Sequence, residues 1–223
     1  MDEGQLWDRA RWLWLAALAG GISYFAAVML RLDGPIIWAW KASGVGLLAA
    51  WAAVNARGTG GWMIAAAMAF GALGDWMLDA IGMMQGAAAF AAGHVIAIAL
   101  YFGNRRAAMT GSQKLLVFAV VPLALLAAWG LTKQAATEQI TAAIGYTAVV
   151  ALMAATAWAS RFPRYRAGIG AMLFLASDLF IFAGEGGALS KNVTMWFVWP
   201  LYFGGQALIA WGVVSTLAHD RRA

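Results

Sequence analysis

Cysteine is absent from this chain of 223 residues, and charged residues are scarce. Without cysteine there is no disulfide framework, no thiol nucleophile and no cysteine-based metal site. Only 11% of the residues are charged, whereas 63% are hydrophobic, and the mean hydropathy is +0.73. A soluble domain is about half apolar and about a quarter charged. The composition therefore predicts an all-α, polytopic membrane protein.

Several sequence motifs of catalysis and nucleotide binding are also missing. There is no Walker loop, dinucleotide fingerprint, serine-centred elbow or helical zinc motif with paired histidines. The chain has two histidines and no pair at helical spacing, so a zinc site has little support. The net charge of +5 is better explained by Lys and Arg at a membrane surface than by a nucleic-acid partner. We therefore expect no metal, no cofactor and no nucleic acid.

Apolar runs long enough to cross a bilayer recur along the chain. A transmembrane helix needs about 20 apolar residues and satisfies its backbone hydrogen bonds internally. Turn-forming residues separate the runs, as at Asp33-Gly34-Pro35 and Thr110-Gly111-Ser112. The first run is longer than the core of a signal peptide, so we expect it to be retained. The sequence predicts a single transmembrane domain over residues 1–223, with eight helices at about 12–30, 36–55, 62–80, 85–103, 114–131, 139–160, 167–184 and 194–217.

Lys and Arg are distributed unevenly between the two sides of this expected bundle. Eleven of the fifteen fall on the side of the two termini, including Arg221 and Arg222. The opposite side has only Arg31, Lys133 and Lys191, and Lys41 lies within a span. By the positive-inside rule, both termini face the cytoplasm. We expect a protein of the bacterial inner membrane.

Two carboxyl groups lie inside apolar helices. Asp75 is in AAMAFGALGDWMLDA (66–80), and Asp178 is in GAMLFLASDLFIFAGEG (170–186). Burying such a group costs about 2.5–3.5 kcal/mol on the insertion scale, so an intramembrane acid usually has a function. One interpretation is structural: each acid is protonated and joins neighbouring helices by hydrogen bonds. The other is chemical, because a protonated acid beside an ionised one is the arrangement used in general acid–base catalysis.

Other polar residues fall at the same depth as these two acids in the expected topology, given about 1.5 Å of rise per residue. They are Lys41, His94, Tyr146, Tyr202 and Gln206. A shared layer predicts a common buried polar cavity, open toward the non-cytoplasmic side or laterally into that leaflet. Asp79 and Glu185 lie at helix ends and are interpreted as interfacial. Lys41 either extends to the interface or pairs with an acid, and we favour the pair.

These residues, in this order, resemble the YhhN-like lysoplasmalogenase family from about residue 36 onward. The matching features are Lys41 in the second helix, Gly74-Asp75 in the third, His94 in the fourth, Tyr146 in the sixth, Gly170 through Asp178 in the seventh, and Tyr202 with Gln206 in the eighth. The chain departs from the family pattern at Ala42, where the family usually has proline after the lysine. This difference concerns the local shape of the second helix.

The resemblance implies an integral-membrane hydrolase that cleaves the vinyl ether of lysoplasmalogens to a fatty aldehyde and a glycerophospho-headgroup. Asp75 and Asp178 would be the catalytic pair, acting on a lysophospholipid among membrane lipids. The residues that would bind the substrate or adjust the acids are Lys41, His94, Tyr146, Tyr202, Gln206 and Asp79. Two alternatives stay open: a metal-dependent membrane lipid amide or ester hydrolase, and a proton-coupled small-solute transporter. The oligomeric state does not follow from the sequence.

Overall fold

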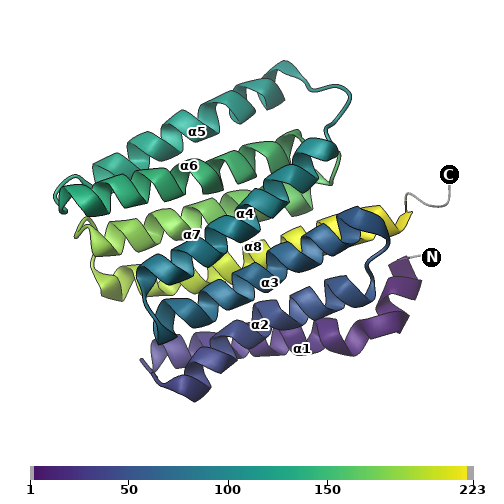
Figure 1. Ribbon diagram of the computed structural model, residues 1–223, viewed down its shortest axis with the longest axis horizontal. Coiled ribbons are helices and arrows are strands. Elements are labelled where there is room, and N and C mark those ends of the chain that lie inside the picture. Colours follow the sequence, from purple (N-terminus) through teal and green to yellow (C-terminus); the bar gives the residue numbers. More distant parts are fainter. Residues whose placement is uncertain (1–2, 220–223) are drawn as a thin grey trace.

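The computed structural model describes residues 3–219, which form eight α-helices and contain no β-strand (Figure 1). The helices are α1 (Glu3–Met29), α2 (Pro35–Val54), α3 (Gly58–Ala80), α4 (Met83–Gly103), α5 (Gly111–Thr132), α6 (Thr137–Ala159), α7 (Ile169–Glu185) and α8 (Lys191–His219). A π-helical turn, η1 (Arg164–Gly168), precedes α7. All eight are long and apolar enough to cross a membrane. The predicted all-α polytopic membrane fold is confirmed.

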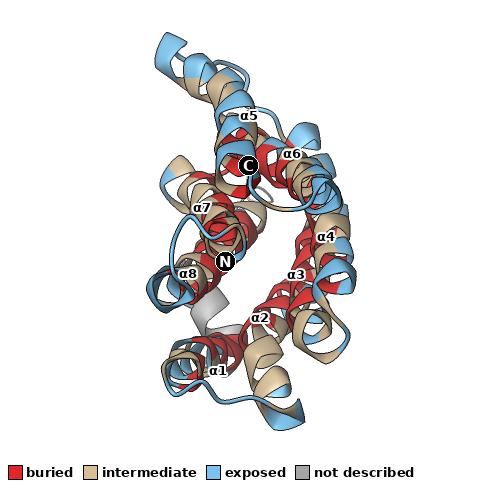
Figure 2. Ribbon diagram, turned by 90° about the vertical axis from the view of Figure 1, so that its left-hand side faces the viewer, coloured by how far each residue is buried: buried red, intermediate tan, exposed pale blue. Residues whose placement is uncertain are grey.

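Seven of these helices form a closed ring, and the eighth lies outside it. Around the ring the order is α1, α2, α3, α4, α6, α7 and α8, and α8 packs against α1 to close the circuit. Helix α8 also packs against α2 and α3. Helix α5 is peripheral and packs against α6 and α7 only, within the described residues (Figure 2). Helices α4 and α6 are therefore neighbours in the ring, although the outlying helix α5 lies between them in the sequence.

Glycine and proline set the boundaries of several helices. Gly34, with φ of 121°, turns the chain, and Pro35 then begins α2 at a position where its missing N–H costs nothing. Gly82, with φ of 144°, makes the short turn between α3 and α4. Helix α3 begins at Gly58, earlier than the apolar run alone indicates. Its glycine-rich first turn packs closely, because a Cβ on Gly61 would lie 2.8 Å from the Cα of Ala56.

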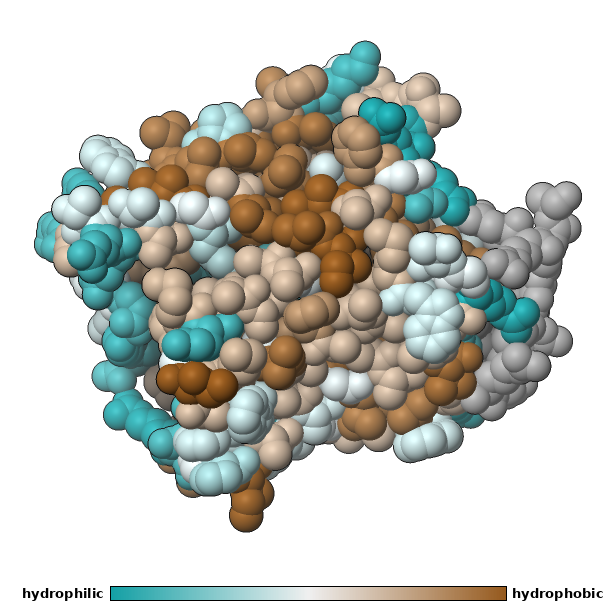
Figure 3. Space-filling model, viewed as in Figure 1, coloured by the Kyte–Doolittle hydropathy of each residue, from teal (hydrophilic) through white to brown (hydrophobic). Residues whose placement is uncertain are grey.

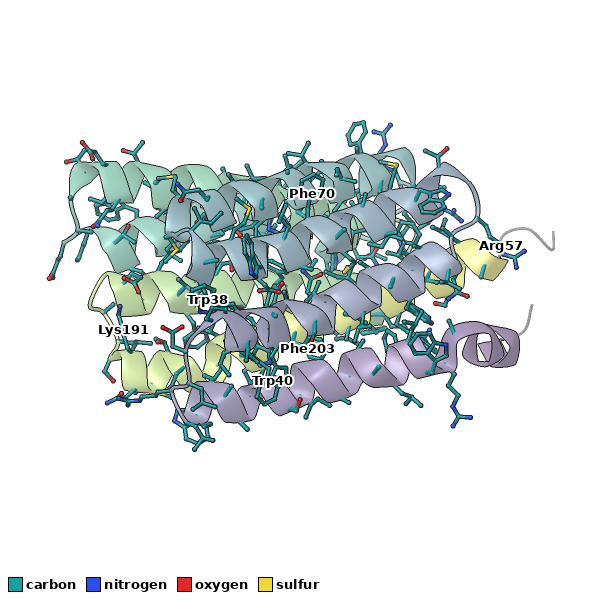
Figure 4. The ribbon with its side chains drawn as sticks, turned by 60° about the horizontal axis from the view of Figure 1, so that its bottom comes forward. Trp38, Trp40, Arg57, Phe70, Lys191 and Phe203 are labelled. Carbon is teal, nitrogen blue, oxygen red and sulfur yellow. The ribbon has the colours of Figure 1, made fainter. Side chains whose placement is uncertain are left out.

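Helix α8 approaches its neighbours closely where glycines face it. A Cβ on Gly170 of α7 would lie 2.6 Å from the carbonyl oxygen of Gly205 on α8. On the other side of α8, the ring of Phe203 (Figure 4) rests against Gly21 of α1 and Gly44 of α2. Small residues allow helices to pack tightly where lipid provides no hydrophobic driving force. These contacts hold α8 in the bundle and fix the depth of its polar residues.

The two ends of the bundle differ from its middle. Apolar side chains cover much of the middle of the face in Figure 3, and hydrophilic ones gather toward the ends. Glu3 and His219 lie at the same end (Figure 1), with Arg57 there and Lys191 at the opposite end (Figure 4). Arg221 and Arg222, which contribute to the expected orientation, lie outside the described residues.

Candidate functional site

Asp75 lies on α3 and is held by a tyrosine of α8. The Tyr202 hydroxyl donates a hydrogen bond of 2.7 Å to Asp75 Oδ2, and the Asp75 residue is only 2% exposed. Gln206, one turn further along α8, hydrogen-bonds to Tyr202. Gly71 lets this part of α8 approach α3, because a Cβ there would lie 3.0 Å from Gln206 Nε2. We call Asp75, Tyr202 and Gln206 the Asp75 cluster.

Asp178 lies on α7 and is held in a similar way by a tyrosine of α6. The Tyr146 hydroxyl hydrogen-bonds to the Asp178 carboxyl, and His94 Nε2 of α4 lies 3.3 Å from the same hydroxyl. Asp178 is 6% exposed, and its Oδ2 has no hydrogen-bond partner within residues 3–219. We call Asp178, Tyr146 and His94 the Asp178 cluster. The unpaired oxygen is unusual, because a buried acceptor without a partner costs about 1–3 kcal/mol.

The two clusters meet at one aromatic ring. Phe174 lies one turn before Asp178 on α7, and its ring centroid is 4.7 Å from that of His94 and 5.1 Å from that of Tyr202. Tyr146 interacts electrostatically with Asp75 as well as with Asp178. The structure therefore brings together six of the residues singled out in the sequence: Asp75, Asp178, His94, Tyr146, Tyr202 and Gln206.

Lys41 and Asp79 form an ion pair at the edge of this site. Lys41 Nζ lies 2.9 Å from Asp79 Oδ2, and the two side chains are 14% and 25% exposed. Lys41 also interacts electrostatically with Asp75. The prediction that Lys41 pairs with an acid is confirmed, and the acid is Asp79. Glu185, the other acid at a helix end, pairs at 2.8 Å with Lys191, and both of these side chains are exposed.

The interior of the site is more tightly packed than the sequence indicates. A cavity of about 20 Å³ lies among α3, α4, α6, α7 and α8, with His94 and Gln206 in its lining. This volume has room for about one water molecule. Neither Asp75 nor Asp178 lines it. The expected common polar cavity is thus a packed polar cluster with one small cavity beside it, because aromatic rings such as Phe90 and Phe174 occupy the space.

Two contributors to the site were not identified from the sequence. Phe174 lies between the clusters; it falls within the Gly170–Asp178 stretch of the resemblance, but it was given no role, because a phenylalanine in an apolar helix gives no sign of whether it faces lipid or a site. Tyr24 of α1 interacts electrostatically with Asp75 and Asp79 and is 8% exposed. It lies before residue 36, where the resemblance begins. A tyrosine at mid-helix in the first span is the one signal that could have identified it.

The arrangement offers two carboxyl groups, each with a tyrosine hydroxyl, and space for about one water. Within residues 3–219, no three His, Asp or Glu side chains gather as a set that could hold a metal ion. The metal-dependent alternative therefore has no ligand set in the described part of the chain. Proton transfer between buried acids, tyrosines and a histidine is the chemistry that these groups support.

Comparison with known proteins agrees with the features of the sequence. The model of the YhhN family matches residues 36–213, which run from the start of α2 into α8 and include every site residue named above except Tyr24. Neither curated proteins nor solved structures give a match. Because the family model covers well over half of the chain, this protein belongs to the YhhN family, which is the lysoplasmalogenase family.

Proposed function

We propose that this protein is a lysoplasmalogenase, which hydrolyses the vinyl-ether bond of a 1-alkenyl lysophospholipid in the membrane. Family membership supports the class of reaction. The observation that carries the proposal is the buried pair of acids, Asp75 and Asp178, on different helices and each hydrogen-bonded to a tyrosine. Such a pair can supply the proton donor for vinyl-ether hydrolysis and a carboxylate that stabilises the oxocarbenium ion.

The chemistry consumes one water and needs no group transfer to the protein. A proton adds to the β-carbon of the vinyl ether and leaves an oxocarbenium ion. Water adds to this ion, loses a proton, and the hemiacetal breaks down to a fatty aldehyde and the free hydroxyl of the glycerophospho-headgroup. The site must supply a proton donor, a negative charge near the cation and a positioned water.

The surroundings of the two acids suggest different roles for them. Burial and the nearby Asp79 oppose ionisation of Asp75, but this acid has two groups that favour its ionised form, the Lys41 ammonium and the Tyr202 hydroxyl. Asp178 has the Tyr146 hydroxyl as its partner, and its Oδ2 is unpaired in the described part of the chain. A carboxylate without a cation is costly within a membrane. We therefore assign proton donation to Asp178 and stabilisation of the oxocarbenium ion to Asp75.

The remaining residues have roles in binding and orientation under this proposal. The small cavity beside His94 and Gln206 can hold the attacking water, with these two side chains as its polar partners. Lys41 lies at the partly exposed edge, where its ammonium can bind the substrate phosphate in exchange for Asp79. A cavity of about 20 Å³ is too small for an alkenyl chain. We therefore expect lipid entry to begin with separation of the Lys41–Asp79 pair.

The test is aldehyde release from a 1-alkenyl lysophospholipid by the purified full-length protein in detergent. Asp178→Asn should lower kcat by about 10²–10⁴, the usual contribution of a general acid, and Asp75→Asn by about 10²–10³. Asp33→Asn is the control, because Asp33 is an exposed acid hydrogen-bonded to Trp38 between α1 and α2. In D₂O, with the aldehyde reduced at once, one deuterium should appear at carbon 2 of the product.

Related substrates separate this proposal from the alternatives. The matching 1-alkyl ether should be inert, because it has no double bond to protonate. Release of fatty acid from a 1-acyl lysophospholipid, with activity lost on chelation, would instead support a metal-dependent hydrolase. Full activity in both asparagine variants would refute the two-acid mechanism. No aldehyde from the wild type, together with solute flux in proteoliposomes, would identify a transporter.

A further inference from the structure

A second, larger cavity lies on the outside of the helix ring, and neither Asp75 nor Asp178 lines it. It is a groove between α4 and α5 with α6 as its floor, and its volume is about 490 Å³. Ligand pockets in proteins usually measure about 300–1,000 Å³. The groove exists because α5 packs against α6 and α7 but not against α4, within the described residues. In Figure 2, α5 projects beyond the rest of the bundle.

The lining of this groove is apolar along its length and positively charged at one end. Phe102, Val117 and Phe118 form its walls, Leu152 belongs to its floor, and Arg105 lies two residues after the end of α4. The lining residues of α6 span Leu152 to Ala159, so the groove is about 10 Å long at about 1.5 Å per residue. An amphiphile with one anionic group and an apolar chain matches this profile.

Arg105 is held in place at the mouth of the groove. Its guanidinium lies 4.3 Å from the centroid of the Phe102 ring, a cation–π distance. The two neighbouring arginines bind the chain itself: Arg106 donates to the carbonyl oxygens of Ser160 and Phe162, and Arg161 donates to Asn104 Oδ1. Of these three arginines, Arg105 is the one that lines the groove.

The groove is separate from the candidate active site. Tyr101, which is completely buried, lines both the groove and the small cavity beside His94, and so forms the wall between them. None of the residues to which we assign a role in hydrolysis lines the groove. It also opens near the end of the bundle that carries Arg57, whereas Lys41 and Asp79 lie toward the other end.

We propose that this groove binds an anionic membrane phospholipid, with the phosphate at Arg105 and the upper part of one acyl chain between α4 and α5. The charge of Arg105 selects the headgroup, and the apolar walls hold the chain. The bound lipid fills the gap between α4 and α5. It belongs to the leaflet that the distribution of Lys and Arg predicts to be cytoplasmic. This site does not depend on the proposed hydrolysis.

The test uses the purified full-length protein in detergent, with native mass spectrometry to count bound lipids. Phosphatidylglycerol should remain bound under conditions that remove phosphatidylcholine with the same chains. Arg105→Gln should weaken phosphatidylglycerol binding by about fivefold or more, the usual effect of one cation near an anionic surface, and Arg105→Lys should retain most of the binding. Arg57→Gln is the matched control, because Arg57 is exposed at the same end and does not line the groove.

A second pair of variants tests the groove itself. Val117→Trp places a large ring between α4 and α5 and should reduce lipid binding, whereas Leu115→Trp should not, because Leu115 is 71% exposed on α5 and does not line the groove. Equal binding of the two lipids, equal loss in Arg57→Gln and Arg105→Gln, or unchanged binding in Val117→Trp would each overturn the proposal. Aldehyde release by Arg105→Gln in detergent should equal that of the wild type, whether or not the lipid is bound.

Discussion

The two buried acids have tyrosine hydroxyls as their hydrogen-bond partners. A tyrosine donates a hydrogen bond without adding a charge, and its ring packs well in an apolar bundle. Tyr202 binds Asp75 across α3 and α8, and Tyr146 binds Asp178 across α6 and α7. In the Asp178 pair, one carboxyl oxygen stays without a partner in the described residues. This geometry fixes the orientation of each carboxyl group, and under the proposed function the unpaired oxygen of Asp178 is the one that meets the substrate.

Tyr202→Phe should lower the rate of aldehyde release while leaving the fold intact. The variant removes the 2.7 Å hydrogen bond to Asp75 and changes little in shape. A hydrogen bond to a charged group contributes about 1.5–3 kcal/mol, so kcat should fall by roughly ten- to a hundredfold. Steady-state kinetics with a 1-alkenyl lysophospholipid measure the effect.

Tyr101→Phe is the matched control for this variant. Tyr101 is just as buried, but its hydroxyl has no partner within residues 3–219. Tyr101 lines the small cavity, but we assign its hydroxyl no role in hydrolysis. Removing this unpaired hydroxyl should therefore leave kcat unchanged and should not lower the melting temperature. Equal loss of activity in the two variants would show that Tyr202 acts only through packing.

For single residues, the sequence identifies the polar side chains of the site better than it identifies which of them contact one another. Hydropathy alone reveals Asp75 and Asp178, because a charge in an apolar helix stands out. The partner of Lys41 could not be chosen, since Asp75 and Asp79 are one turn apart on the same face of α3. The way in which α2 packs against α3 determines the partner of Lys41, and that partner is Asp79. Tyr24 joins the site through the closure of the ring by α1 and α8, which no local pattern encodes.

Among the elements, the contact between α7 and α8 most directly supports the site. Asp178 lies on α7, and Tyr202 and Gln206 lie on α8. The backbones meet at Gly170 and Gly205, where a Cβ on either residue would lie 2.6 Å from the carbonyl oxygen of the other. A backbone atom cannot rotate away as a side chain can. Any side chain at these positions must therefore move one helix relative to the other.

Gly205→Ala should destabilise the protein and reduce its activity. Overpacking typically costs about 1–3 kcal/mol, which for a chain of this size lowers the melting temperature by roughly 2–12 °C. Gly204→Ala, one residue earlier, is the control, because a Cβ there meets no atom within 4 Å. Alanine also favours helix formation over glycine. Thermal unfolding in detergent should separate the two variants, and equal melting temperatures would contradict the close contact.

The number of helices follows from the sequence, but their order in space does not. Each apolar run is long enough to span a bilayer, so eight helices could be predicted. Most faces of these helices are apolar, because lipid and the protein interior are alike in polarity. The periodic pattern that reveals the buried face of a helix in a soluble protein is therefore missing. The position of α5 outside the ring, with only Ala124, Ala128 and Thr132 of this helix buried, therefore becomes visible only in the structure.

For the whole molecule, the distribution of charge predicts how the bundle sits in the membrane. The ends of the described chain lie together (Figure 1), at the end that carries Arg57 and the arginines of the α4–α5 and α6–α7 connections. The opposite end has Arg31, Lys133 and Lys191. The lipid groove opens near the first end, and the Lys41–Asp79 pair lies toward the second. Under the proposed function, the orientation of the bundle therefore decides which leaflet supplies the substrate.

Reporter fusions in a bacterial host test this orientation. A green fluorescent protein joined to the C-terminus should fluoresce, and alkaline phosphatase joined there should be inactive, because positive charge keeps this end in the cytoplasm. Alkaline phosphatase inserted between α7 and α8, after Gly187, should be active. The reverse result at both sites would place the Lys41–Asp79 edge in the cytoplasmic leaflet. The substrate would then have to come from lipids on that side, and the groove beside Arg105 would face the other leaflet.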